Sequence, residues 1–217
     1  MVSLFLISLI LFLSMLTPSA AVEYFPLKQD DSKIQAALNY LRTLQNPDGG
    51  ISNPGEKSEV GKTEWVVIAI AAAGEDPHEW IKNGNSPIDY LRANSENLEG
   101  STEYERMILA LVASGEDPRN FNGTDYVEIL KREYLKENGQ FSDYIYTTIW
   151  GILALAAVGE DVSSSVEWLK KQQNSDGGFG WAVGEPSDYD DTAAAIEALI
   201  AAGMDPRDRV IRDALDY

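Results

Sequence analysis

The chain has 217 residues, of which 44% are hydrophobic, and this is enough apolar sequence to bury the core of one globular domain. Its 35 acidic and 17 basic residues give a formal charge of -18, a field that repels nucleic acid and anionic membrane surfaces and attracts cations. The absence of cysteine excludes disulfides, thiolate metal sites and thioester chemistry, and the single histidine, His78, excludes a site built from several imidazoles.

The N-terminus has the pattern of an export signal. The apolar run over residues 4–16 is too short for a comfortable membrane span, and Ser19 and Ala21 suit the small-residue positions before a cleavage site. We therefore predict a signal peptide over residues 1–21, a mature domain over 22–217, and a secreted or cell-surface location. Because no Lys or Arg precedes the apolar run, an uncleaved anchor stays open as the one membrane contact.

Four copies of one apolar helical segment follow. Each copy is alanine-rich and ends in glycine, an acidic turn and then Pro or Val, over residues 63–77, 103–118, 147–162 and 191–206. Such segments are too long for strands and rich in helix formers, so they predict helices buried on most sides. We expect each helix to end at a left-handed glycine, namely Gly74, Gly115, Gly159 and Gly203. The next turn is expected to be capped by Asp76, Asp117 and Asp205.

A second, amphipathic kind of helix precedes each apolar one. Apolar residues recur every three or four positions over residues 34–45, 86–95, 125–137 and 164–173, and a fifth such segment begins at Val210. Each repeat is therefore predicted to pair an outer amphipathic helix with an inner apolar one. Tandem hairpins of this kind cannot bury their faces alone and must stack on their neighbours.

The link from outer to inner helix carries paired glycines, in "LQNPDGGI" and "QQNSDGGFGW". Glycine permits positive φ and close backbone approach, which a tight return between layers requires. The preceding aspartates are expected to fix the bend as Asx turns, and the glutamines to bind loop backbone, at Asp48, Asp176, Gln45 and Gln173.

These residues resemble the repeats of the terpenoid cyclase and protein prenyltransferase superfamily, the prenyltransferase/squalene oxidase repeats. The resemblance lies in the Q-x-x-D-G-G-F-G-x loop at Gln173–Trp181, its echo at Gln45–Ile51, and the D-x-D-D-T-A run at Asp188–Ala193. It implies an all-α fold, an α/α toroid in which inner helices ring a cavity and outer helices encircle them. A complete toroid has six hairpins, so we expect an incomplete ring of about four of six, from a fragment of a longer protein.

The acidic run within this motif needs an explanation, because neighbouring like charges repel unless they share a proton, a cation or a helix end. The resemblance to squalene–hopene-type cyclases implies Asp190 as the acid that protonates an alkene or epoxide, with Asp188 and Asp191 in support. Aromatic faces for the resulting carbocation would come from Trp150, Phe179, Trp181 and Tyr189.

A structural explanation of the same run stands beside the catalytic one. Asp191 or Thr192 can N-cap a helix, and acidic residues in the first turn complement the helix dipole. The first and third repeats carry Thr63 and Thr147-Thr148 at this place, which favours capping as the shared role of the threonine.

Several classes of function stay open. Protein prenyltransferase activity is disfavoured, because its zinc site requires Cys as well as His. A carbohydrate-acting enzyme would pair Asp190 with Glu185 or Asp188 as acid and base. The resemblance to secreted cobalamin carriers implies a non-enzymatic module instead, with a small-molecule or protein ligand at the mouth of the toroid cavity. We favour this binding module, and a class II terpene cyclase is the alternative.

Two smaller predictions complete the sequence analysis. No cofactor is expected, although the oxygen-rich acidic run would suit calcium. Asn122 lies in an Asn-Gly-Thr sequon and is a candidate for N-glycosylation in an exported protein.

Overall fold

A computed structural model describes residues 29–217, so the predicted signal peptide lies outside the described residues. Within that range the chain forms nine α-helices and two short 3-10 turns, and its only β pairing is in isolated bridges between loops. The α-helices are α2 (Ser32–Leu44), α3 (Val60–Ala72), α4 (Pro87–Asn94), α5 (Ser101–Ala113), α6 (Tyr126–Tyr134), α7 (Ile145–Ala157), α8 (Ser163–Lys170), α9 (Tyr189–Ala201) and α10 (Arg209–Asp216). The 3-10 turns are η1 (Pro77–Glu79) and η2 (Ser95–Asn97).

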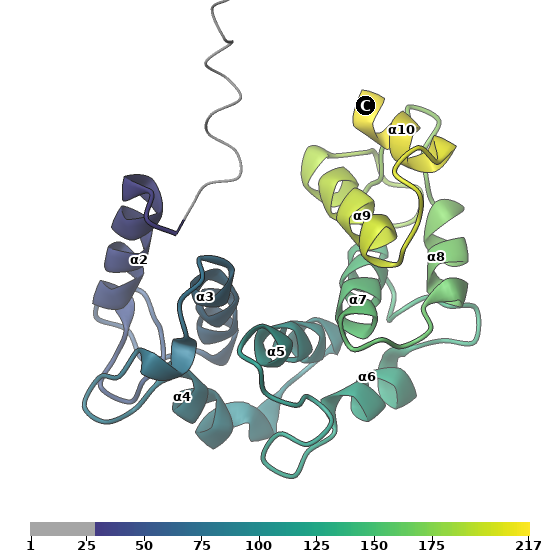
Figure 1. The fold of residues 1–217 in the computed structure, drawn as a ribbon. Coiled ribbons are helices and arrows are strands. Elements are labelled where there is room, and N and C mark those ends of the chain that lie inside the picture. Colours follow the sequence, from purple (N-terminus) through teal and green to yellow (C-terminus); the bar gives the residue numbers. More distant parts are fainter. Residues whose placement is uncertain (1–28) are drawn as a thin grey trace, which may run out of the picture.

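The helices form an open arc of two layers (Figure 1). The four helices α3, α5, α7 and α9 line the inner side of the arc, and α2, α4, α6, α8 and α10 lie outside them. Each inner helix packs against the next inner helix along the chain. The predicted alternation of outer and inner helices in an all-α fold is therefore confirmed.

The burial of the two layers follows their sequence patterns. The inner helix α7 has buried residues all along its length, whereas the outer helix α8 buries one face, at Ser165, Trp168 and Leu169. The outer helix α6 ends at Tyr134 and does not continue to residue 137 as the periodicity indicated. Its boundary is set by Leu135, which adopts extended backbone and pairs with Phe141 across the next loop.

The turns after the inner helices are built as predicted. All four glycines have left-handed backbone, with φ of 81°, 78°, 75° and 85° at Gly74, Gly115, Gly159 and Gly203. The three predicted aspartates each accept a hydrogen bond of 2.9 Å from the backbone N–H two residues ahead, at Asp76, Asp117 and Asp205. This geometry reverses the chain from the inner to the outer layer.

The glycine-rich loops also contact the following repeat through side-chain hydrogen bonds. Asp176 accepts the N–H of Gly178 at 3.0 Å, and the Gln173 amide donates to the carbonyls of Gly177 and Val210, both at 2.8 Å. The loop therefore binds α10, the following outer helix. The first loop has corresponding bonds at Asp48 and Gln45, except that Gln45 reaches the carbonyl of Trp80 at the end of η1 rather than an outer helix.

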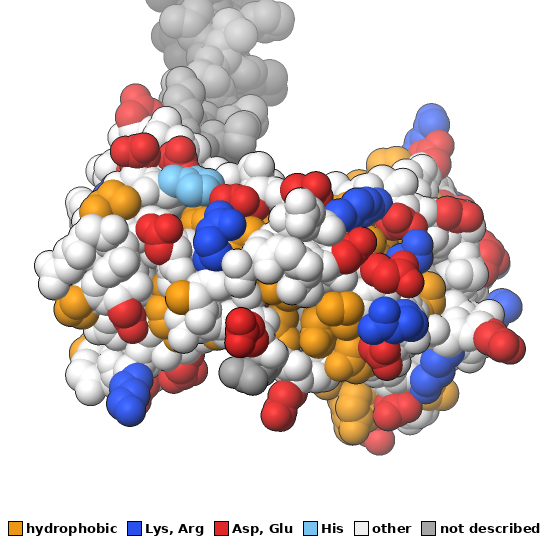
Figure 2. All heavy atoms as spheres, turned by 90° about the horizontal axis from the view of Figure 1, so that it is seen from below, with side chains coloured by type: hydrophobic (Ala, Val, Ile, Leu, Met, Phe, Trp, Pro, Cys, Tyr) orange, Lys and Arg blue, Asp and Glu red, His pale blue; other side chains and the backbone are white. Residues whose placement is uncertain are grey.

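The outer side of the arc is a mixed, charged surface. Figure 2 shows acidic and basic side chains interspersed over it, with hydrophobic side chains between them. The glutamate of each Gly-Glu-Asp turn pairs with a basic residue of the outer helix before it, in the pairs Arg42–Glu75, Arg92–Glu116 and Lys131–Glu160. No helix among residues 29–217 is both long and apolar enough to cross a bilayer.

His78 joins two of these turns. Its ring nitrogens lie 2.8 Å from Asp76 and 3.1 Å from Glu116. Burial lowers the pKa of the imidazole, but the hydrogen bonds to Glu116 and Asp76 outweigh this and raise it. His78 is thus a partly exposed structural link between neighbouring repeats.

Candidate functional site

The first acidic residue of the run starts α9. Asp188 has extended backbone, and its carboxylate accepts the N–H of Asp191 at 2.8 Å. The N-cap is therefore Asp188, and the expectation of Asp191 or Thr192 at this position is corrected. The reason is the preceding loop, because the backbone N–H of Asp188 pairs with the carbonyl of Phe179 at 3.0 Å and leaves Asp188 as the last extended residue.

The threonine of the motif has a different shared role from the one expected. Thr192 is buried one turn into α9, where its hydroxyl oxygen accepts the N–H of Phe179 at 2.9 Å. The equivalent hydroxyls of Thr63 and Thr148 accept the N–H of Ile51 and Phe141. The threonine therefore fastens the glycine-rich loop to the inner helix.

The remaining two carboxyl groups of the run have different environments. Asp190 is exposed on the first turn of α9, whereas Asp191 is partly buried. Burial, a hydrogen bond with Asp188, and the charges of Asp188 and Asp190 raise the pKa of Asp191 to about 6. The crowding of acids is thus tolerated because one acid caps a helix end and a second binds a proton more readily than an ordinary aspartate.

Two of the predicted cavity aromatics lie away from the inner surface. Phe179 is fully buried in the main hydrophobic core and presents no surface to a ligand in this arrangement. Tyr189 is 76% exposed, and its ring lies 5.2 Å from that of Tyr217, which follows α10.

The other two predicted aromatics belong to a larger group on the inner side. The rings of Trp65 and Trp150 are 5.3 Å apart, edge to face, although α5 separates the helices α3 and α7 that carry them. Side chains from α3 and α7 can meet past α5 only on the concave side of the arc, where the inner helices come closest together. Trp65 nevertheless remains 43% exposed.

This aromatic group extends along α7 to the last glycine-rich loop. Tyr146 lies one turn before Trp150 on the same helix face, and its ring stacks on Tyr144 with centroids 5.3 Å apart. Tyr144 in turn meets the exposed ring of Trp181 at 5.4 Å. We call Trp65, Trp150, Tyr144, Tyr146 and Trp181 the aromatic platform.

An ion pair lies beside this platform between α3 and α5. The guanidinium of Arg106 donates to the Glu64 carboxylate at 2.8 Å and lies 6.0 Å from the centre of the Trp65 ring. Glu64 is fully buried. Its burial outweighs the favourable contact with Arg106 and raises the pKa of Glu64 to about 7.

A second buried acid lies between α5 and α7. Glu105 is fully buried, and neither of its carboxyl oxygens has a well-aligned hydrogen bond, although Ser101 lies close enough to act on the carboxyl group as a weak donor. Burial raises the pKa of Glu105 well above its usual value, and Ser101 and Arg106 offset this only in part. Tyr146 is close enough for the charges of Glu105 and Asp191 to raise its own pKa, which burial raises most.

Sequence reasoning missed most of these groups. It did not single out Trp65, Glu64, Glu105, Arg106 or Tyr146 as members of a site. A signal was present, because glutamates inside apolar inner helices are rare and these two occupy the same place in successive repeats. Their burial depends on which face of each helix meets its neighbour.

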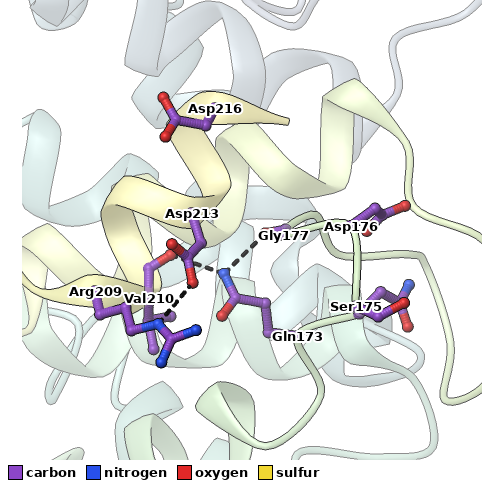
Figure 3. Close-up of a pocket in the computed structure, with 9 residues that line it drawn as sticks. Gln173, Ser175, Asp176, Gly177, Arg209, Val210, Asp213 and Asp216 are labelled. Atoms are coloured by element: carbon purple, nitrogen blue, oxygen red, sulfur yellow. Dashed lines mark hydrogen bonds and ion pairs between the residues drawn. The ribbon is translucent and has the colours of Figure 1, made fainter.

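Separate polar pockets lie at the glycine-rich loops. Figure 3 shows the one beside α10, about 580 Å³ in volume, where Gln173 points to Gly177 and Val210, and Arg209 pairs with Asp213 at 3.2 Å. A similar pocket of about 470 Å³ adjoins the first loop, at Asp48 and Ser58. Since a pocket occurs at two of these loops, each time where the loop meets an outer helix, the architecture of the repeat accounts for both.

The suitability of the acidic run for calcium stays a prediction. Among the side chains described within residues 29–217, no three His, Asp or Glu groups are placed to hold one ion. Asp188 is already engaged by the backbone of Asp191. Asn122, the sequon residue, lies exposed in a tight turn with φ of 54°, and its amide donates to the Arg92 carbonyl at 3.3 Å.

The comparison with known proteins agrees with the geometry. A family model described as the prenyltransferase alpha-alpha toroid domain matches residues 5–124 and again residues 124–216. The two matches together span nearly the whole chain.

Proposed function

The chain belongs to the prenyltransferase alpha-alpha toroid family, and from that premise we propose that it is a binding module whose inner side takes up a small-molecule or protein ligand. The observation that carries the proposal is the aromatic platform, where Trp65 and Trp181 keep 43% and 46% of their surface exposed. Contiguous exposed aromatic surface on a soluble domain is a mark of an interaction site, and such rings serve as binding anchors.

The placement of the platform supports this role. Trp65 projects from α3, and Trp150 and Tyr146 project from α7; both helices pack against α5, so the rings are held on rigid elements. Rigid aromatic side chains lose little conformational entropy when a ligand binds, which favours affinity. As part of the same proposal, the apolar run over residues 4–16 directs the module to the cell surface or outside the cell.

The alternative is a class II terpene cyclase, and one observation favours it. Asp191 has a pKa raised to about 6 and lies close enough to Tyr146 to influence it, so a carboxyl group that binds a proton more readily than usual adjoins an aromatic surface. Two features favour the binding module instead. Asp190 is exposed, and an acid with a raised pKa gives up its proton less readily to an alkene.

A thermal-shift panel tests the binding proposal. We would compare organic cations, sugars, aromatic metabolites and polyprenyl compounds for their effect on the Tm of the wild type and of Trp65→Ala/Trp150→Ala. A ligand of this site should raise the wild-type Tm in a concentration-dependent way and leave the double variant unchanged. Tyr40→Ala, which removes an exposed ring from the outer helix α2, is the matched control.

The outcomes separate the two functions. A ligand that stabilises both the wild type and the double variant equally would place binding elsewhere and contradict the proposal. Conversion of a polyprenyl substrate by the wild type, abolished by Asp190→Asn, would establish the cyclase in its place.

A further inference from the structure

Two successive contacts between inner helices carry equivalent buried acids. Glu64 lies ten residues before Gly74 on α3, and Glu105 lies ten residues before Gly115 on α5. Both side chains are fully buried. The repeat therefore presents a carboxyl group at the same place to the next inner helix, first to α5 and then to α7.

The first contact supplies a cation for its acid. Arg106 projects from α5, bonds to Glu64 at 2.8 Å, and lies 6.0 Å from the Trp65 ring centre. The guanidinium also fits closely over Gly61, because a Cβ there would lie 3.0 Å from its Nη2 atom. The Arg106 guanidinium is thus held by the Glu64 carboxylate and the Trp65 indole ring, in space that Gly61 leaves free because it has no side chain.

The second contact has the acid but lacks the cation. The residue of α7 that corresponds to Arg106 is Trp150, nine residues before its glycine as Arg106 is before Gly115. Neither oxygen of Glu105 has a well-aligned hydrogen bond, and Ser101 and Arg106 offset the burial of the carboxyl group only in part. A buried carboxyl group without a partner costs free energy, and native proteins retain few of them without a reason.

We propose that the contact between α5 and α7 is a site for the cationic group of a ligand, an alkylguanidinium or alkylammonium, which pairs with Glu105 and lies against Trp150 and Tyr146. This inference rests on the proposed function and specifies its ligand class. The positive charge of the ligand takes the place between α5 and α7 that the Arg106 guanidinium has between α3 and α5.

Charge and accessibility support this ligand class. The formal charge of -18 attracts organic cations to the molecule, and the indole and phenol rings favour a cation over their faces. Since Glu105 is fully buried, the cation reaches it only when neighbouring side chains move. Trp150 and Tyr146 are both only partly buried, so they are placed to make that movement from the inner surface.

Isothermal titration calorimetry with butylguanidinium and butylammonium tests the proposal, with neutral butylurea as the isosteric control. We expect both cations to bind and butylurea not to bind. Glu105→Gln keeps the shape of the side chain but removes its charge, and it should weaken cation binding at least tenfold. Glu197→Gln, a change of an exposed acid on α9, should bind the cations like the wild type and so controls for general attraction.

The inference fails if butylurea binds as well as the cations, if Glu105→Gln binds them undiminished, or if neither cation binds. Circular dichroism and the Tm of each variant verify that it folds. A panel ligand that depends on Trp65 and Trp150 but not on Glu105 would overturn this inference and leave the proposed function standing. Dependence on all three residues supports both.

Discussion

At the scale of single residues, the inner side of the arc depends on polar groups placed in apolar surroundings. Thr192 is nearly fully buried, yet its hydroxyl has a partner, because it accepts the N–H of Phe179 at 2.9 Å. Glu105 is fully buried and has no well-aligned hydrogen bond. A buried polar group with a hydrogen-bond partner stabilises the fold, whereas a buried polar group without one lowers its stability.

The buried acids should make the protein less stable as pH rises. The pKa of Glu64 is about 7 in the folded state against 4.5 usually, so the folded state holds a proton that the unfolded state releases. The contribution of Glu64 to the free energy of unfolding is fully present below about pH 4.5 and is lost as pH rises through about 7. For this pKa shift the loss is roughly 3 kcal/mol. Glu105 acts in the same direction.

Urea unfolding at pH 5 and at pH 8 measures this effect. We expect a lower free energy of unfolding at pH 8, and a smaller difference between the two pH values in Glu105→Gln, which has no carboxyl group to ionise at this position. An unchanged pH dependence in Glu105→Gln would mean that this carboxyl group has the same pKa in the folded and the unfolded state.

At the scale of elements, the glycine-rich loop decides how each outer helix docks. Gly177 has φ of 93°, and a Cβ there would lie 2.3 Å from the Asp213 carbonyl oxygen of α10. Gly49 and Gly139 make the same close approach to the backbone at Ser86 and Ser164. The glycine is therefore required both for its backbone conformation and for the contact between repeats.

A pair of alanine substitutions separates these two requirements. Gly184 lies in the same loop with φ of 86°, but a Cβ there meets nothing within 4 Å. We expect Gly184→Ala to cost about 1–2 kcal/mol of stability through backbone strain alone. Gly177→Ala should cost more, because α10 must also move away from the loop. Equal losses in urea unfolding would show that the close contact adds nothing.

The sequence predicted the helices and the turns after them well, and the residue that starts α9 less well. The glycine at the end of each inner helix needs only local chemistry, so Gly74 and Gly203 were identified correctly. The start of α9 was misplaced because Asp191 and Thr192 are also good capping residues, and the bridge from Phe179 to Asp188 makes Asp188 the cap instead. The burial of Glu105 was missed because it depends on packing between helices from different repeats.

At the scale of the whole molecule, the core is divided along the chain. Leu38, Ile51, Val66, Ile70 and Trp80 form a cluster of their own, separate from the main cluster that runs through the later repeats. The first outer helix α2 has one buried residue, Leu38, whereas the inner helix α7 has eight. Stacked repeats are stabilised by their neighbours, so an inner helix with neighbours on both sides should be the most stable.

Native-state hydrogen exchange should show this gradient directly. We expect the amides of α2 to exchange through local opening at a lower free energy than those of α7, whose exchange should approach global unfolding. Leu38→Ala should then lower protection mainly in α2. Ile149→Ala, at a fully buried position in α7, should lower it throughout the arc, by about 2–5 kcal/mol. If both substitutions lowered protection uniformly, the arc would unfold as one unit and the division of its core would have no energetic consequence.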